Sequence, residues 1–192
     1  LSLDQIIEEV KIGTTIGTNA LLEKKGARTA LIVTKGFKDL LEIGHQNREF
    51  LFLLNIKKEK RFWENSFEVG GRINSSRKIV EVLDKNQLRK ILENINIKNF
   101  DSVAIALVNS YINPEHEKLV ARQLKDLGFD NIVLSHLSSS TLGYVDRANT
   151  AVVDAYLLPL LHEYVASLKR ALGRTTFSIM QSHGGLTDAE NF

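Results

Sequence analysis

Cysteine is absent from this chain of 192 residues, and proline is scarce, with two residues. Without cysteine, the chain can form no disulfide, no thiolate metal site and no cysteine nucleophile. Long apolar runs are also lacking: none approaches the roughly 18 continuous residues of a membrane-spanning helix, and no signal-peptide pattern opens the sequence. We therefore expect a cytoplasmic protein.

An excess of charge of one sign is lacking as well. The chain has 25 basic and 23 acidic residues and a formal net charge of +2. Because no stripe of Lys and Arg stands out, nucleic acid is not expected as a partner; the short basic stretch Lys57–Arg61 is typical of a solvated loop. An apolar content of 43% can fill the core of one substantial domain or two small lobes.

What is present is an alternation of apolar runs and amphipathic segments. Apolar runs at Thr29–Thr34, Asp101–Asn109 and Asn131–His136 predict buried strands. Between the last two, Pro114–Leu127 predicts a helix that begins with proline and ends before Gly128. A strand–helix–strand unit of this spacing indicates parallel strands. The fold class is therefore α/β, a mostly parallel sheet with helices on both faces.

The sequence divides into four segments. Residues 1–46 hold a glycine and hydroxyl motif with the first strand–helix unit, 47–83 an aromatic-rich excursion, 84–143 an α/β lobe, and 144–192 a long helix and a strand. Expected helices are Leu3–Val10, Asn86–Ile95 with Asp84 as its N-cap, and Tyr144–Leu172 with a break or kink near Pro159. The excursion is expected to contain a hairpin between Phe67–Val69 and Ile79–Val82, and Thr175–Gln181 a strand.

The first candidate site is the cluster Gly13, Thr14, Thr15, Gly17, Thr18 and Asn19. Backbone N–H groups and hydroxyls at the start of a helix form a pocket for an oxyanion or a carboxylate. The same residues also fit a plain capped helix start, which is the commoner outcome for such a pattern. Neither a P-loop nor a dinucleotide-binding fingerprint occurs.

Two further segments could carry chemistry. Gln181–Gly185 follows an apolar strand, where α/β sheets bind ligands, and includes Ser182, His183 and Gly184. Asp146, Arg147, Thr150 and Asp154 recur at three- and four-residue steps and share one helix face. This face suits either an ion-pair network or the wall of a cleft, in which Arg147 would pair with phosphate or carboxylate and an Asp pair would hold Mg²⁺ through water. The histidines form no local zinc pattern, and no nucleophile elbow is present.

Four stretches together resemble the hydantoinase A/oxoprolinase family. They are GTTIGTNALLEKKGARTALIVTKGFKDLLEIGHQ (13–46), IALVNSYINPEHE (105–117), DRANTAVVDAYLLPLL (146–161) and IMQSHGGL (179–186). Their order and spacing agree with the family over nearly the whole chain. The resemblance implies an actin-like, sugar-kinase-like ATPase fold. It also implies that ATP phosphorylates the amide oxygen of a ring such as 5-oxoproline or a hydantoin, after which water opens the ring.

Cofactors, partners and site residues follow from this resemblance. It implies ATP and Mg²⁺, a small cyclic amide substrate, an oligomer, and a second hydrolytic subunit or domain. The implied substrate- or phosphate-binding residues are Thr14, Thr15, Asn19, Arg147, Thr150, Ser182, Gly184 and Gly185; no catalytic acid, base, nucleophile or metal ligand is assigned. Membrane and nucleic acid are not expected partners.

The chain also departs from the family pattern. Ile12 stands where the family has His, and Asp146, Asp154 and His183 replace Glu, Asn and Asn. The family's two glycine-rich phosphate loops are missing, so we expect an internal fragment of a larger subunit, incomplete by itself. Two alternatives stay open: a non-catalytic scaffold or assembly subunit, and a subunit of an ATP-dependent ketone carboxylase.

Overall fold

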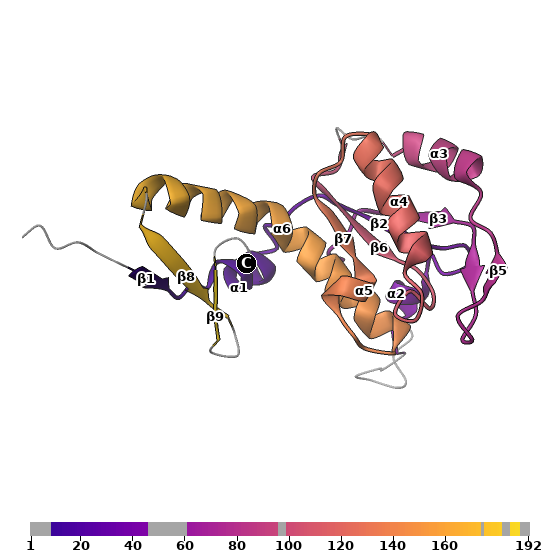
Figure 1. The fold of residues 1–192 in the computed structure, drawn as a ribbon, viewed down its shortest axis with the longest axis horizontal. Coiled ribbons are helices and arrows are strands. Elements are labelled where there is room, and N and C mark those ends of the chain that lie inside the picture. Colours follow the sequence, from indigo (N-terminus) through magenta and orange to yellow (C-terminus); the bar gives the residue numbers. More distant parts are fainter. Residues whose placement is uncertain (1–8, 46–60, 96–98, 174, 182–184, 189–192) are drawn as a thin grey trace, which may run out of the picture. The chain divides into compact units, whose positions relative to one another are not determined.

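The computed structural model describes residues 9–45, 61–95, 99–173, 175–181 and 185–188 (Figure 1). The chain forms two compact units: unit 1 is Leu1–Gly26 with Pro159–Phe192, and unit 2 is Ala27–Leu158. The boundary falls inside helix α6, Tyr144–Leu172, at Pro159. The long C-terminal helix predicted from the sequence is therefore confirmed. The four segments defined from the sequence describe the order of the motifs along the chain. They are a different division from these two units.

Unit 2 is built on a four-stranded parallel sheet with the strand order β3-β2-β6-β7. Its strands are β2 (Thr29–Thr34), β3 (Asn65–Val69), β6 (Ser102–Ala106) and β7 (Ile132–Leu134). The strand that follows β2 in the sequence, β3, lies on one side of it, and the strand that follows β6, β7, lies on the opposite side of the sheet. The direction in which successive strands are added therefore reverses between β2 and β6. The predicted α/β class with parallel strands is confirmed.

Strand β2 shows why this sheet is covered on both faces. All six of its residues are buried. Ala30 and Ile32 join one hydrophobic cluster, whereas Leu31 and Val33 join another. Because successive side chains of a strand point to opposite faces, the continuous apolar run divides between two cores. This is the arrangement that such a run predicts.

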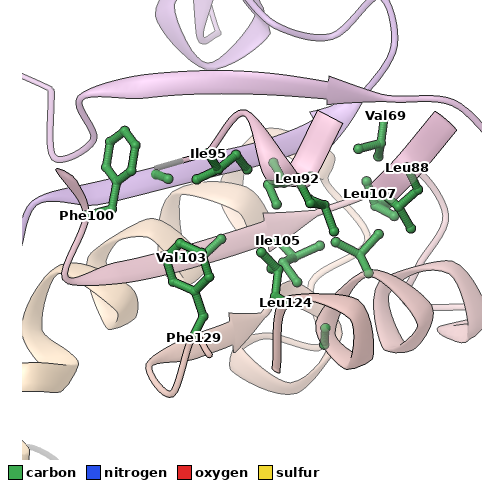
Figure 2. Close-up of a cluster of buried hydrophobic side chains, with 14 of the residues drawn as sticks. Val69, Leu88, Leu92, Ile95, Phe100, Val103, Ile105, Leu107, Leu124 and Phe129 are labelled. Atoms are coloured by element: carbon green, nitrogen blue, oxygen red, sulfur yellow. The ribbon is translucent and has the colours of Figure 1, made fainter. Parts of the chain in front are cut away.

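Helices α3 (Lys85–Glu93) and α4 (Glu115–Asp126) cover one face of the sheet. The cluster on this face includes Leu88 and Leu92 of α3, Leu124 of α4, and Val103 and Ile105 of β6 (Figure 2). Burying each of these aliphatic side chains stabilises the fold by about 1.5–3 kcal/mol relative to exposure.

The start of α3 agrees with its sequence signal. Asp84 accepts hydrogen bonds from the backbone N–H groups of Asn86 at 2.7 Å and Gln87 at 3.1 Å. This carboxylate satisfies two donors that the first turn of a helix leaves open. The predicted N-cap is confirmed.

Helix α6 covers the opposite face with its first part. Ala148, Val152 and Ala155 are buried against Leu31 and Val33 of β2. By length and composition α6 is apolar enough to cross a membrane, with a mean hydropathy of 1.2 over its most apolar window. Packing against the sheet accounts for its buried apolar positions in unit 2.

The described part of the aromatic-rich segment 47–83 folds differently from the predicted hairpin. β3 pairs in parallel with β2, and β5 (Ile79–Glu81) pairs instead with β4 (Arg72–Ile73) in an antiparallel ladder. Gly71, with φ of +84°, turns the chain between β3 and β4. The hairpin prediction was wrong about the partner because β3 pairs with the fully buried strand β2 at the edge of the parallel sheet. Residues 46–60 lie outside the described residues.

Unit 1 contains a three-stranded sheet in the order β1-β8-β9. Its strands are β1 (Glu9–Ile12), β8 (Thr176–Met180) and β9 (Leu186–Asp188), and helix α1 is Ile16–Glu23. Val165 and Leu168 of α6 pack against Phe177 and Ile179 of β8. The predicted strand near the C-terminus is confirmed. The predicted helix Leu3–Val10 is wrong at Glu9 and Val10, which pair with Thr176 and Phe177 in the sheet; residues 1–8 lie outside the described residues.

Candidate functional site

Two predicted motifs begin at the same edge of the unit 1 sheet. Strands β1 and β8 run parallel, and Ile12 lies opposite Ile179. The chain therefore leaves β1 at Gly13 and β8 at Gln181 on the same, carboxyl edge. Ligands of α/β sheets bind at this kind of edge. The structure thus brings together the starts of two motifs that lie far apart in the sequence.

Helix α1 begins just after β1, and backbone N–H groups in its first turn have no acceptor among the described residues. Thr15 is the N-cap residue but its side chain caps no N–H, while Thr14 Oγ1 accepts from the N–H of Ile16 at 3.2 Å. Within the described residues, nothing accepts a hydrogen bond from the N–H of Gly17 or Thr18. The first turn carries no acidic residue. Free N–H groups and the positive end of the helix dipole make this position suitable for an anion.

The hydroxyl of Thr15 is held beside these donors. Asn19 Nδ2 donates to Thr15 Oγ1 at 3.4 Å, and both side chains are exposed. A side chain at Gly13 would meet nothing within 4 Å, so the space next to its backbone is open. Thr14, Thr15 and Asn19 therefore form one short polar segment that a phosphate or carboxylate can approach.

The second motif is described only at its two ends. Gln181 donates its backbone N–H to the carbonyl of Gly185 at 2.8 Å. Ser182, His183 and Gly184 lie outside the described residues. The roles predicted for Ser182, Gly184 and Gly185 stay predictions.

Arg147 belongs to unit 2, where its side chain is buried with 1% exposure. Its Nη1 donates to the carbonyl oxygens of Thr141 at 3.1 Å and Leu142 at 3.4 Å, and its Nη2 donates to that of Leu107 at 3.4 Å. Its Nε donates to Ser135 Oγ at 3.3 Å. These bonds tie the loops that follow β6 and β7 to the start of α6.

Two aromatic rings complete the surroundings of this guanidinium. Its central carbon lies 5.1 Å from the ring centre of Tyr111 and 5.8 Å from that of Tyr144. Burial lowers the pKa of Arg147 and raises that of Tyr144, whose hydroxyl donates to the carbonyl of Ala106 at 2.9 Å. Arg147 is built as a positioning residue, because its donors already hold backbone carbonyls; its predicted contact with substrate stays a prediction.

Thr150 and the aspartates of the same helix face do not form one cluster. Thr150 donates its hydroxyl to the carbonyl of Asp146, four residues earlier, at 2.9 Å. Asp146 pairs instead with His45, Oδ1 to Nε2, at 2.8 Å. Burial raises the pKa of Asp154, and a hydrogen bond from Ser138 opposes that rise. The predicted roles of Thr150 and of an Asp pair that holds Mg²⁺ stay predictions.

Sequence reasoning did not single out Glu117, whose side chain is fully buried. Its Oε1 accepts from Ser135 Oγ at 2.6 Å and from the N–H of Leu107 at 2.9 Å. Its Oε2 lies 2.6 Å from His136 Nδ1. One signal in the sequence could have found it: Glu117 precedes Val120 and Leu124 by three and seven residues, so a carboxylate occupies the apolar face of α4.

Among the residues that the structure describes, no group of three or more His, Cys, Asp or Glu side chains could hold a metal ion. Mg²⁺ bound with a nucleotide takes most of its ligands from phosphate oxygens and water. The described side chains therefore do not define a metal site of their own.

The chain matches two family descriptions along its length. Residues 2–128 match the hydantoinase/oxoprolinase N-terminal region, and residues 147–192 match hydantoinase/oxoprolinase. It is 33% identical to a 5-oxoprolinase from Dictyostelium discoideum over 97% of this chain, which spans 17% of that relative. The chain thus corresponds to about a sixth of such a relative's length.

Two solved structures share its fold. The ATP-dependent caprolactamase from Pseudomonas jessenii superposes with a TM-score of 0.85 and 26% identity, over 96% of this chain and 28% of that one. A nucleotide-free acetone carboxylase gives a TM-score of 0.83 at 19% identity, over 99% and 30%. These likenesses agree with the actin-like fold that the sequence motifs imply. By its motifs, its fold and these matches, the chain belongs to the hydantoinase/oxoprolinase family.

Proposed function

We propose that this chain is part of an ATP-dependent enzyme that opens a cyclic amide, such as 5-oxoproline or a hydantoin. The family match and the likeness to an ATP-dependent caprolactamase support ATP-dependent amide chemistry. The observation that supports the proposal is the start of α1 at the carboxyl edge of the unit 1 sheet, where no described residue accepts a hydrogen bond from the N–H groups of Gly17 and Thr18 and where the hydroxyls of Thr14 and Thr15 are close in the sequence.

This edge binds a phosphate or carboxylate oxyanion through fixed donors. The N–H groups of Gly17 and Thr18 and the hydroxyl of Thr15 donate to the anion, and Asn19 orients that hydroxyl. When bound, ATP supplies the phosphoryl group that activates the amide oxygen, and Mg²⁺ neutralises phosphate charge. Donors that are already in place need no rearrangement as charge develops on the transferred group.

The other predicted binding residues have supporting roles, each within its own unit. Ser182, Gly184 and Gly185, which follow β8 in the sequence, supply further polar groups to the bound substrate or phosphate. Arg147 positions the loops of unit 2, and Thr150 adds a polar group to the same helix. A second hydrolytic subunit or domain and an oligomeric assembly complete the proposal.

The test is turnover by the full-length protein that contains this chain. Wild type, Thr15→Ala and Thr141→Ala are compared for ADP formation and ring opening with 5-oxoproline and with hydantoin. Losing one anion donor lowers kcat by about 10²–10³-fold, so we expect a drop of this size for Thr15→Ala. Thr141→Ala, which also removes an exposed threonine hydroxyl, should retain wild-type turnover.

The other outcomes distinguish the alternatives. Near-normal turnover in Thr15→Ala would remove this hydroxyl from the site. Wild-type turnover that needs bicarbonate and a ketone would indicate a carboxylase instead. Failure of the full-length protein to bind ATP–Mg²⁺ in calorimetry would indicate a non-catalytic scaffold.

A further inference from the structure

The hairpin of strands β4 and β5 is largely exposed on the surface of unit 2. All three residues of β5 are exposed, and Val82, which follows it, keeps 78% of its surface exposed. Figure 1 shows β5 at the outer margin of this unit. A segment with so few buried apolar contacts opens at a lower free energy than the core of the fold.

The base of the hairpin packs against one histidine. Gly71 precedes β4, and Leu83 follows β5 by two residues and is buried. A Cβ on Gly71 would lie 2.9 Å from Leu83 Cβ and 3.1 Å from both Cε1 and Nδ1 of His116. The imidazole of His116 therefore lies against the backbone of Gly71, where the two ends of the hairpin meet.

His116 occupies a position that is unfavourable for a positive charge. It is the second residue of α4, near the positive end of the helix dipole, and only 7% of it is exposed. Burial lowers the pKa of His116, and the carboxylates of Glu115 in α4 and Glu81 in β5, which favour the charged ring, do not offset this effect. The closed hairpin therefore holds the imidazole in its neutral form at pH 7.5.

Two asparagine side chains of the β6–α4 connection also hold the hairpin. Asn109 Nδ2 donates to the carbonyl oxygen of Ile73 at 2.7 Å, and Asn113 Nδ2 donates to that of Arg77 at 3.3 Å. Amide side chains carry no charge, so a proton taken up between pH 7.5 and pH 5 does not break these bonds. A response of the hairpin to acid has to come from another contact.

We infer that His116 is a pH-sensitive latch of the β4–β5 hairpin, closed while the imidazole is neutral and opened when the imidazole takes up a proton. The charged ring needs water around it, and water reaches it only when Gly71 moves away from α4. In the open form the pKa of His116 returns to its ordinary value of 6.5. Opening is therefore favoured as the pH falls below 6.5, until the lower pKa of the closed form is passed.

The latch lies at the edge of the unit 2 sheet where ligands of α/β folds bind. Gly71 follows the carboxyl end of β3 by two residues, and ligands bind beyond the carboxyl ends of parallel strands. Acid would thus change the shape of this edge within unit 2. The inference stands apart from the proposed function, because it concerns a conformational change and no step of the reaction.

Hydrogen exchange of the full-length protein, measured by mass spectrometry and corrected for the intrinsic effect of pH on exchange, tests the latch. Protection of the hairpin segment 70–83 is compared with protection of α3 at pH 7.5 and pH 5. Proton uptake by a group with a pKa of 6.5 raises the opening constant between these pH values by at most about thirtyfold. We expect hairpin protection in wild type to fall by about three- to thirtyfold, and α3 protection to change less than about twofold.

Three variants identify the titrating group. His116→Gln removes the ring and should keep hairpin protection the same at both pH values; His116→Asn replaces it if that variant does not fold. Glu81→Gln should retain the response to acid, because Glu81 acts on the hairpin through the charge of His116. His162→Gln is the matched control, since His162 is an exposed histidine of unit 1, and it should respond like wild type.

Four results would overturn the latch. They are unchanged hairpin protection in wild type, an equal response in the His116 variant, loss of the response in Glu81→Gln, and an equal loss of protection in α3. The third would identify Glu81 as the titrating group, and the fourth would indicate unfolding of the whole unit. The measurement needs no turnover, so failure of the proposed function would leave its outcome unaffected.

Discussion

Ser135 lies between Glu117 and Arg147 and hydrogen-bonds to both. Its Oγ donates to Glu117 Oε1 at 2.6 Å and accepts from Arg147 Nε at 3.3 Å. The two buried charges are thus joined through a hydroxyl, 18 residues after the one and 12 before the other. Buried charges persist only when their hydrogen bonds are satisfied. This network ties α4, the start of α5 (Ser135–Ser138) and the start of α6 into one structure.

The first prediction concerns Glu117. Glu117→Gln should lower the free energy of unfolding by about 3–5 kcal/mol, because it leaves Arg147 without a buried counter-charge and gives the Ser135 and Leu107 donors a poorer acceptor. Urea unfolding of this chain measures the difference. Glu93→Gln is the matched control, since within the described part of the chain Glu93 bonds to Arg89 alone, on an exposed helix surface. Equal stability of the two variants would contradict the role of the network.

The second prediction concerns the shape of Arg147. Arg147→Lys keeps the charge but loses the planar fork that reaches the carbonyls of Thr141, Leu142 and Leu107. We expect a loss of about 1–3 kcal/mol in unfolding free energy, since the buried carbonyl of Leu107 and the partly buried carbonyls of Thr141 and Leu142 lose their donors. Arg122→Lys, whose Nε bonds one carbonyl on an exposed helix, should change stability far less. Thermal unfolding of both variants measures the difference between their stability losses.

The third prediction separates backbone strain from steric overlap at two glycines. Gly71 and Gly36 have φ of +84° and +87°. A Cβ on Gly71 would lie 2.9 Å from Leu83 Cβ and 3.1 Å from His116, whereas a Cβ on Gly36 would meet nothing within 4 Å. Gly36→Ala should therefore cost only the backbone penalty of about 1 kcal/mol, and Gly71→Ala about 1–3 kcal/mol more. Similar losses in urea unfolding would show that the contact with Leu83 relaxes freely.

The fourth prediction is a pH dependence of stability at His116. Burial lowers the pKa of His116 from its ordinary value of 6.5. The unfolded chain then binds more protons than the folded one, so stability falls as pH drops below 6.5 until the lower folded-state pKa is passed. Unfolding free energies of wild type and His116→Gln are compared between pH 7.5 and pH 5. The advantage of wild type should shrink with acid; a constant difference would show that His116 does not titrate differently in the two states.

The sequence by itself determined the local elements of this protein. The apolar run of β2, the N-cap Asp84 and the long helix that starts at Tyr144 all follow from patterns within a few residues. Local hydrogen bonding and side-chain periodicity act over these distances, so the chain needs no distant partner to specify them. The family motifs likewise lie within short stretches, which made the membership of the chain readable before its fold.

Only the tertiary structure decided the pairings between distant segments. β3 became a partner of β2, where the sequence had favoured a hairpin with β5, because the gain in buried pairing is visible only once the sheet exists. Arg147 became a buried positioning residue, since its carbonyl partners come from separate loops. The pair of His45 with Asp146, 101 positions apart in the sequence, could not be predicted from the sequence either. Contacts of this kind depend on which surfaces meet in space, and no periodicity along the chain records them.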